Sequence, residues 1–133
     1  MKKIMIITII ITLAIMLIAC GPSKLDTKKA QIIGQMLKVN NVSYTAISSN
    51  GDKAEIIYES SEANKYDAQM VYDWGMIFAS AANFGYNEII IVNTINYMPA
   101  AKLTTDSENV KALGNGEINE SVFWENVRIE AVD

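Results

Sequence analysis

Apolar residues recur at every second position in two neighbouring stretches, residues 42–48 and 53–59. This period is that of a β-strand that turns one face to a core. Asn50-Gly51 lies between the two stretches, and this dipeptide is typical of a tight turn because both residues tolerate a positive φ. The pattern therefore predicts a β-hairpin closed by a type I′ turn.

Apolar residues at helical spacing predict a first helix over residues 26–38, with Asp26 or Thr27 as its N-cap. A longer helix is expected over residues 64–84, because Asn64 is placed to cap its N-terminus. The apolar stripe of this second helix indicates that it lies across a sheet, and it consists of Tyr66, Met70, Trp74, Ile77, Ala81 and Phe84.

Two glycines bear on the longer helix. Gly85 is expected to end it, because glycine readily adopts the left-handed conformation found after helix C-termini. Gly75 lies in the middle, where glycine costs about 1 kcal/mol relative to alanine. We expect Gly75 to permit the close approach of a neighbouring backbone.

The stretch 88–95 is the most strongly apolar of the predicted strands, and it is apolar on both faces near its start. This composition predicts a central place in the sheet. Residues 96–99 are expected to turn the chain, and residues 100–105 to return beside it. Three further elements complete the chain: a helix capped by Asp106 and ending near Leu113, a helix capped by Asn119 and ending near Glu125, and a strand over residues 127–130.

The predicted elements follow the order α-ββ-α-ββ-αα-β. We therefore expect one α+β domain, with a mainly antiparallel sheet of two hairpins plus a short C-terminal strand and with helices largely on one face. The 114 residues from position 20 onward are enough for one domain with its own core, and a second domain would be hard to accommodate.

The N-terminal segment has a different character from the rest. Lys2 and Lys3 precede an apolar run over residues 4–19. As a helix this run would measure about 24 Å. A typical membrane span has roughly 20 residues and measures about 30 Å, so the run is short for a span. A basic start, a short apolar run and small residues at its end are typical of a cleaved secretory signal.

The apolar run ends in Leu17-Ile18-Ala19-Cys20, and Cys20 is the only cysteine of the chain. These residues resemble the lipobox of prokaryotic lipoproteins. The resemblance implies cleavage before Cys20 and a diacylglyceryl group on its sulfur, since two acyl chains anchor a protein stably where one does not. The alternative is an uncleaved signal anchor that ends in an ordinary apolar cysteine. By the resemblance the chain has three parts: a signal peptide (1–19), the lipidated cysteine with a short tether (20–25) and an extracytoplasmic domain held at the cell membrane (26–133).

The charge balance excludes several partners. The whole chain has a formal charge of −4, and without Lys2 and Lys3 nine basic side chains stand against fifteen acidic ones, a charge of −6. Nucleic-acid binding depends on clustered Lys and Arg, so no nucleic-acid partner is expected. Adhesion to anionic lipid through a basic patch is disfavoured for the same reason, and membrane attachment is expected to rest on Cys20.

Histidine is absent, which excludes Ser-His-Asp and Cys-His catalysis within the chain as well as the common zinc sites. No phosphate loop, dinucleotide fingerprint or calcium loop is present, so we expect no cofactor and no metal. The candidate chemistry that is left lies in four carboxylates. They are Glu59, Glu62, Asp67 and Asp73. A pair of them could act as acid and base on a glycan if burial separated their pKa values. We favour the other interpretation, in which they form a solvated acidic face and the acids near the helix start complement the helix dipole.

Three side chains are candidates for contact with a partner. Tyr72 points away from the apolar stripe of the longer helix, whereas Trp74 belongs to that stripe and is expected in the core. Tyr97 and Met98 lie at the tip of a turn, where they either anchor a partner or pack on a neighbouring helix. Asn93 interrupts the central strand and is expected to be a hydrogen-bonded core amide, with ligand recognition as the alternative.

These features together predict a non-enzymatic, lipid-anchored binding or accessory module of the cell envelope. A folded domain with a tether but without the usual catalytic residues favours contact with an envelope protein or another envelope component. Two alternatives stay open. One is a carboxylate-dependent enzyme acting on envelope glycans, and the other is an accessory lipoprotein that holds a small ligand between the longer helix and the sheet.

Overall fold

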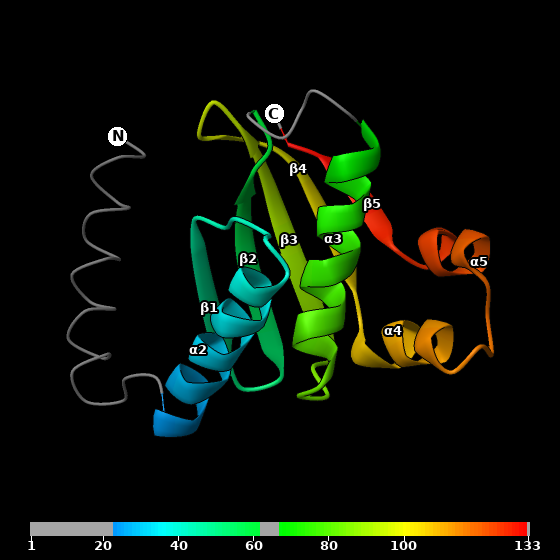
Figure 1. Cartoon of the computed structure of the whole chain (residues 1–133), viewed down its shortest axis with the longest axis horizontal. Helices are drawn as coiled ribbons and strands as arrows, with labels where there is room; N and C mark the ends of the chain where they lie inside the picture. Colours follow the sequence, from blue (N-terminus) through cyan, green and yellow to red (C-terminus); the bar gives the residue numbers. More distant parts are fainter. Residues whose placement is uncertain (1–22, 62–66, 133) are drawn as a thin grey trace, which may run out of the picture.

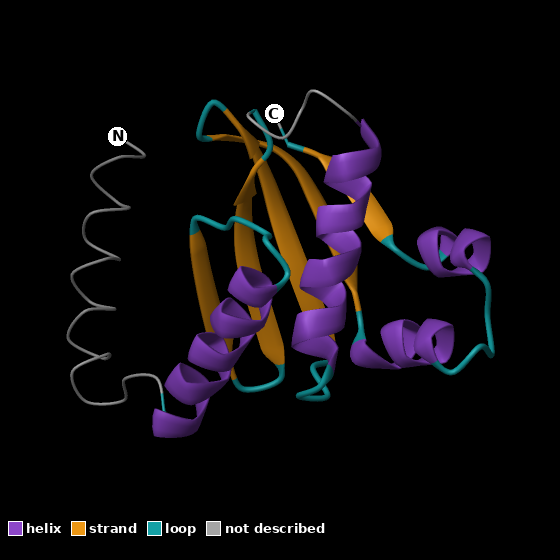
Figure 2. Cartoon of the chain, viewed as in Figure 1, coloured by secondary structure: helices purple, strands orange, loops and turns teal. Residues whose placement is uncertain are grey.

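The computed structural model describes residues 23–61 and 67–132, in which four helices and five strands form one α+β domain (Figures 1 and 2). The elements follow one another in the predicted order, which confirms the fold class. Their bounds are α2 (Lys24–Val39), β1 (Ala46–Asn50), β2 (Lys53–Glu59), α3 (Asp67–Ala82), β3 (Glu88–Ile95), β4 (Met98–Thr105), α4 (Ser107–Gly114), α5 (Glu120–Glu125) and β5 (Arg128–Ala131).

The strands form a single sheet in the order β1-β2-β3-β4-β5, with β3 at its centre as predicted. Three of the pairings are antiparallel, namely β1 with β2, β3 with β4, and β4 with β5. The pairing of β2 with β3 is parallel, because α3 carries the chain back to the opposite end of the sheet between them. The carboxyl ends of β2 and β3 consequently meet at one edge, the upper edge in Figure 1.

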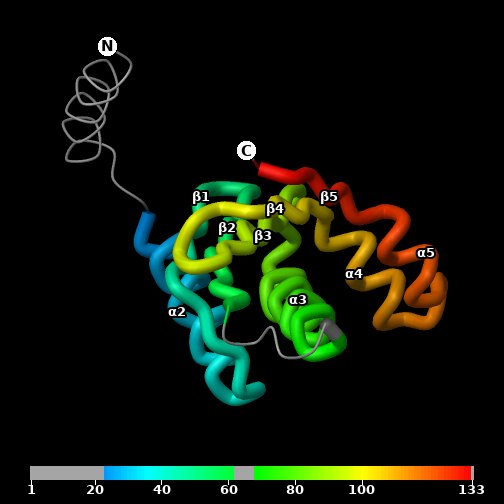
Figure 3. Tube along the Cα trace, turned by 90° about the horizontal axis from the view of Figure 1, so that it is seen from above, coloured from blue at the N-terminus to red at the C-terminus, as the bar shows by residue number. Residues whose placement is uncertain are grey.

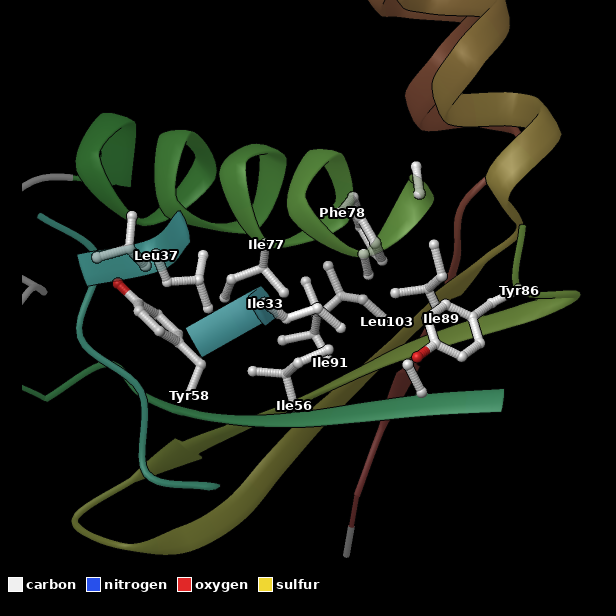
Figure 4. Packing of buried hydrophobic residues seen from close by; sticks show 14 of the residues in the cluster. Ile33, Leu37, Ile56, Tyr58, Ile77, Phe78, Tyr86, Ile89, Ile91 and Leu103 are labelled. Atoms are coloured by element: carbon white, nitrogen blue, oxygen red, sulfur yellow. The ribbon is translucent and has the colours of Figure 1, made fainter. Parts of the chain in front are cut away.

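One apolar row crosses the whole sheet, and its members on β2, β3 and β4 form the base of the core, whereas its member on β5 is exposed. The residues of this row are in register on the five strands. Helices α2 and α3 both cover the face of the sheet on which the row lies (Figure 3). Figure 4 shows the helix side chains that meet this face, including Ile33, Leu37, Ile77 and Phe78. The helices therefore lie largely on one face, as expected. The apolar row of the sheet consists of Ile47, Ile56, Ile91, Leu103 and Ile129.

The start of α2 differs from the prediction. Ser23 is the N-cap, since its hydroxyl accepts a hydrogen bond from the Asp26 backbone N–H, and neither Asp26 nor Thr27 has that role. Asp26 lies in the first turn and accepts hydrogen bonds from the Ser49 hydroxyl and the Gly51 N–H. The Ser23 hydroxyl, together with these two donors, holds the pKa of Asp26 below its ordinary value. Ordered helix thus begins at Lys24, two residues before the expected domain boundary.

The first hairpin forms, but with a different turn. Asn50 pairs with Lys53, so the central residues of the turn are Gly51 and Asp52 and only Gly51 has a positive φ, of 62°. The prediction of a type I′ turn on Asn50-Gly51 was therefore wrong in two respects: strand pairing includes Asn50, which moves the turn by one residue, and Asp52 lacks the positive φ that a type I′ turn requires. Strand β1 also begins four residues later than expected.

The remaining boundaries agree with the prediction to within a few residues. Asp106 and Asn119 cap α4 and α5 as expected, each accepting a hydrogen bond from the backbone three residues later. Gly85 has a φ of 68° after the end of α3. The predicted cap Asn64 lies outside the described residues. The expectation that Gly75 permits the close approach of a neighbouring backbone was wrong. Apart from its chain neighbours and the backbone of its own helix, no heavy atom of the described residues lies within 4 Å of the position a Cβ would take there.

The predicted signal peptide (1–19), Cys20 and the first residues of the tether lie outside the described residues. None of the helices in residues 23–61 and 67–132 is long and apolar enough to cross a membrane.

Candidate functional site

A cleft of about 530 Å³ opens at the edge where the carboxyl ends of β2 and β3 meet. This is the end of a parallel pair at which open sheets with crossover helices commonly place ligands. The residues that line it come from the α2–β1 connection, the end of β2, the first turns of α3 and the β3–β4 turn. They are Asn41, Ser43, Tyr44, Thr45, Tyr58, Glu59, Gln69, Asp73 and Tyr97.

Asp73 is the most deeply buried charged group of the cleft, with 5% of its surface exposed. The Tyr58 hydroxyl donates a hydrogen bond to Oδ2 of Asp73, and the Gln69 amide donates one of 2.9 Å to Oδ1. Gln69 precedes Asp73 by four residues, so one turn of α3 places the donor beside the acceptor. The Asp73 carboxylate is thereby fixed in position on the cleft wall.

Tyr58 is a core residue whose hydroxyl reaches the cleft. Figure 4 shows its ring at one end of the core, with Tyr86 at the opposite end. Burial, with the hydrogen bond and the negative charge of Asp73 in addition, raises the pKa of Tyr58 above its usual range. The Tyr58 hydroxyl is therefore a permanent hydrogen-bond donor to Asp73 at neutral pH.

Glu59 lines the same cleft as Asp73, but its hydrogen-bond partners are different. Its carboxylate accepts hydrogen bonds from the Tyr97 N–H (2.6 Å), the Thr94 hydroxyl (2.7 Å), the Ser61 N–H (2.9 Å) and the Asn96 N–H (3.0 Å). Partial burial favours the neutral acid, but the hydrogen bonds from Ser61, Thr94 and Tyr97 outweigh it and lower the pKa of Glu59 from 4.5 to about 2. Glu59 is ionised at neutral pH and holds the β3–β4 turn.

That turn is a two-residue loop between the paired residues Ile95 and Met98. Asn96 and Tyr97 both have positive φ angles, 52° and 64°, so the type I′ geometry occurs here. Tyr97 and Met98 are 74% and 71% exposed, so they are not packed on a helix, and their contact with a partner stays a prediction. Tyr97 borders the cleft, and Met98 is exposed beside it.

Behind the cleft, Asn93 is a hydrogen-bonded core amide, as expected. It is buried, accepts a hydrogen bond from the Trp74 indole N–H (3.3 Å) and donates one to the Ser60 hydroxyl (3.1 Å). Trp74 is partly buried against the core and tilted against Trp124. Asn93 therefore fixes the strand ends that carry the cleft and does not line it.

Tyr72 belongs to a second hollow, a groove of about 560 Å³ between α3, α4 and α5. Tyr72 is 53% exposed, as its position off the apolar stripe predicts. Gly75 also lines this groove, which explains why a Cβ there would meet open space. The three candidate contact residues hence do not form one surface, because Tyr97 and Met98 lie at the β3–β4 turn.

The structure brings together two of the four predicted carboxylates, Glu59 and Asp73, with Tyr97. Glu62 lies outside the described residues, and nothing is described of the Asp67 side chain. Sequence reasoning missed Gln69 and the α2–β1 connection as parts of the site. The signal for Gln69 was its spacing of four residues from Asp73, whereas the α2–β1 connection joins the cleft only through the tertiary fold.

No protein-family model, curated protein or solved structure matches the chain. Within the described ranges, no group of three or more His, Cys, Asp or Glu residues is placed to hold a metal ion.

Proposed function

We propose that this chain is a lipid-anchored, extracytoplasmic and non-enzymatic module that binds an envelope component at the cleft and the adjoining β3–β4 turn. The observation that carries the proposal is the exposure of Tyr97 and Met98 beside a polar, tyrosine-lined cleft. Large side chains exposed at a rigid turn, next to a concave surface, are typical of contact sites.

The placement of the cleft supports this role. Helix α2 starts at the lower end of the domain in Figure 1, and the β3–β4 turn lies at the upper end. A lipid on Cys20 would lie only a few residues before Lys24, so it would attach the lower end to the membrane. The cleft then faces away from the bilayer, where a partner in the envelope can reach it.

The geometry of the two carboxylates favours binding over catalysis. Glycan hydrolysis requires one carboxylic acid that holds a proton near neutral pH and one ionised carboxylate. The pKa of Glu59 is lowered to about 2, and its oxygens are occupied by the turn, so Glu59 is unsuited to act as the acid. Asp73 is held by Tyr58 and Gln69. The glycan-enzyme alternative is accordingly less favoured.

The proposal is tested by photo-cross-linking of the full chain in its native membrane. A benzophenone amino acid at Met98 is expected to capture a specific partner. The same group at Val122, an exposed apolar position on α5, serves as the matched control. Mass spectrometry of the same samples is expected to find a diacylglyceryl group on the Cys20 peptide, and Cys20→Ala is expected to release the protein from the membrane.

Two results would overturn the proposal. One is a membrane-recovered protein whose Cys20 is unmodified, which removes the lipid anchor. The other is a set of cross-links that does not differ between Met98 and Val122, which removes the β3–β4 turn as a contact site.

A further inference from the structure

The charge of the cleft points to the kind of ligand it accepts. Of the residues that the structure describes, those lining the cleft include two carboxylates and no lysine or arginine. Among the described residues no basic group forms a salt bridge with Asp73. The two salt bridges of these residues lie elsewhere and join Lys53 to Glu88 and Arg128 to Glu130. A buried charge is normally paired, so the cleft favours a cation and disfavours phosphate or carboxylate ligands.

Asp73 retains capacity to bind such a cation. A carboxylate offers about four lone-pair positions, and Tyr58 and Gln69 occupy one on each oxygen. Glu59 contributes negative charge nearby, but its hydrogen bonds to the β3–β4 turn already saturate its oxygens.

The aromatic lining fits the same ligand class. Tyr44, Tyr58 and Tyr97 all line the cleft, and most of the Tyr97 side chain is exposed to solvent. Tyrosine rings attract cations through the negative faces of their π-systems. The cleft volume of about 530 Å³ lies in the range of small-molecule sites.

We propose that the cleft binds a small envelope component through an alkylammonium group, which forms an ion pair with Asp73 beside the rings of Tyr44 and Tyr97. This inference rests on the proposed binding role of the cleft and names the chemistry of its ligand. An amino sugar and a lysine side chain both supply such a group, and the experiment below separates them.

The test uses the full chain in detergent, labelled with nitrogen-15 and observed by NMR. Glucosamine and glucose are the first probe pair, because they differ only in an ammonium group against a hydroxyl. Glucosamine is expected to shift the amide signals of residues 58–59 and 96–97 saturably, and glucose is not. The second pair, N-acetyl-lysine methylamide and its norleucine analogue, reports whether an isolated lysine side chain binds as well as the amino sugar.

Two variants locate the interaction. Asp73→Asn keeps the shape of the side chain and is expected to weaken glucosamine binding about tenfold or more, whereas Glu117→Gln, an exposed acid of the α4–α5 connection, changes it less than about twofold. Tyr97→Asn removes the ring but suits the positive φ of the turn, and is expected to weaken binding about two- to fivefold. If Asp73→Asn does not fold, the weaker binding of glucosamine to Tyr97→Asn shows whether the ligand binds at the cleft.

The inference is overturned if each ammonium probe gives the same response as its uncharged counterpart, if neither ammonium probe shifts the cleft signals at up to about 10 mM, or if Asp73→Asn binds as the wild type does. These outcomes leave the cross-link at Met98 and the lipid on Cys20 untouched. An unmodified Cys20 would in turn remove the proposed function without affecting ammonium binding. The two failures are therefore distinguishable.

Discussion

Glu59 connects the end of β2 to the turn that carries the exposed contact residues. Four donors reach its carboxylate, and three of them belong to Thr94, Asn96 and Tyr97. Asn96 and Tyr97 are both held at positive φ, a conformation that costs a non-glycine residue about 1–3 kcal/mol in unfavourable cases. The Glu59 carboxylate satisfies the backbone N–H groups of this strained turn and thereby keeps it closed.

This role makes stability depend on pH through one residue. The pKa of Glu59 is lowered from 4.5 to about 2, so its stabilising contribution is complete above pH 4.5 and is lost as the pH falls through 2. Glu59→Gln is expected to lower the melting temperature at neutral pH. The difference between wild type and variant is expected to shrink between about pH 4.5 and 2, as thermal melts across that range will show.

Glu55→Gln is the matched control, since Glu55 lies on the same strand and its side chain makes no hydrogen bond within the described residues. The variant is expected to melt in parallel with the wild type over the same pH range. A parallel melt for Glu59→Gln as well would mean that the β3–β4 turn does not depend on the Glu59 charge.

At the scale of elements, the two helical glycines have opposite surroundings. A Cβ on Gly34 of α2 would overlap the Tyr44 hydroxyl, whereas a Cβ on Gly75 of α3 would meet open space. Gly34→Ala is therefore expected to lower the free energy of unfolding by about 1–3 kcal/mol through overpacking. Gly75→Ala is expected to raise it by about 0.5–1 kcal/mol, because alanine is the better helix former. Urea denaturation measures both changes.

The Gly34 clash also links the helix to the cleft, because Tyr44 is part of the cleft wall. Tyr44→Phe removes the atom that the new Cβ would meet first, and is expected to recover part of the stability lost in Gly34→Ala. An additive loss in the double variant would show that the cost arises elsewhere in α2.

Element positions were largely predictable from local signals, as β3 and α5 illustrate. Residues 88–95 combine a high apolar content with length, and Asn119 carries a capping side chain, so both elements form where they were expected. Turn geometry was less predictable. Asn50-Gly51 has the stronger local signal, yet Asn96-Tyr97 adopts the type I′ turn, because Glu59 from another strand supplies the hydrogen bonds.

The cleft was predictable only in part, for a related reason. Sequence alone marked Glu59, Asp73 and Tyr97 as separate candidates, without the parallel pairing of β2 and β3 that brings them to one edge. The role of Gly75 was misjudged because helix propensity shows that a glycine in a helix is costly, but it does not show whether another part of the chain packs against that position. Such properties depend on tertiary packing.

For the whole molecule, the proposed anchor and the cleft lie at opposite ends of α2. This helix has 16 residues, which corresponds to about 24 Å along its axis. The N-cap is already Ser23, so in the sequence only two residues, 21 and 22, separate Cys20 from this cap. With Lys2 and Lys3 removed, the remaining chain has a formal charge of −6, and an anionic lipid surface would repel it. We therefore expect the lipidated protein to stand with its cleft away from the bilayer.

Energy transfer to labelled lipid headgroups measures this orientation. A cysteine introduced at Thr27 or at Met98 would be the only thiol available to a dye, because the proposed lipidation would consume Cys20. Transfer is expected to be efficient from Thr27→Cys at the start of α2 and weak from Met98→Cys at the β3–β4 turn. The contrast is expected to be largest at low salt, where repulsion from anionic lipid is least screened. Equal transfer from both positions would mean that the domain lies flat, in which case the membrane covers the β3–β4 turn and a partner must reach the cleft from the side.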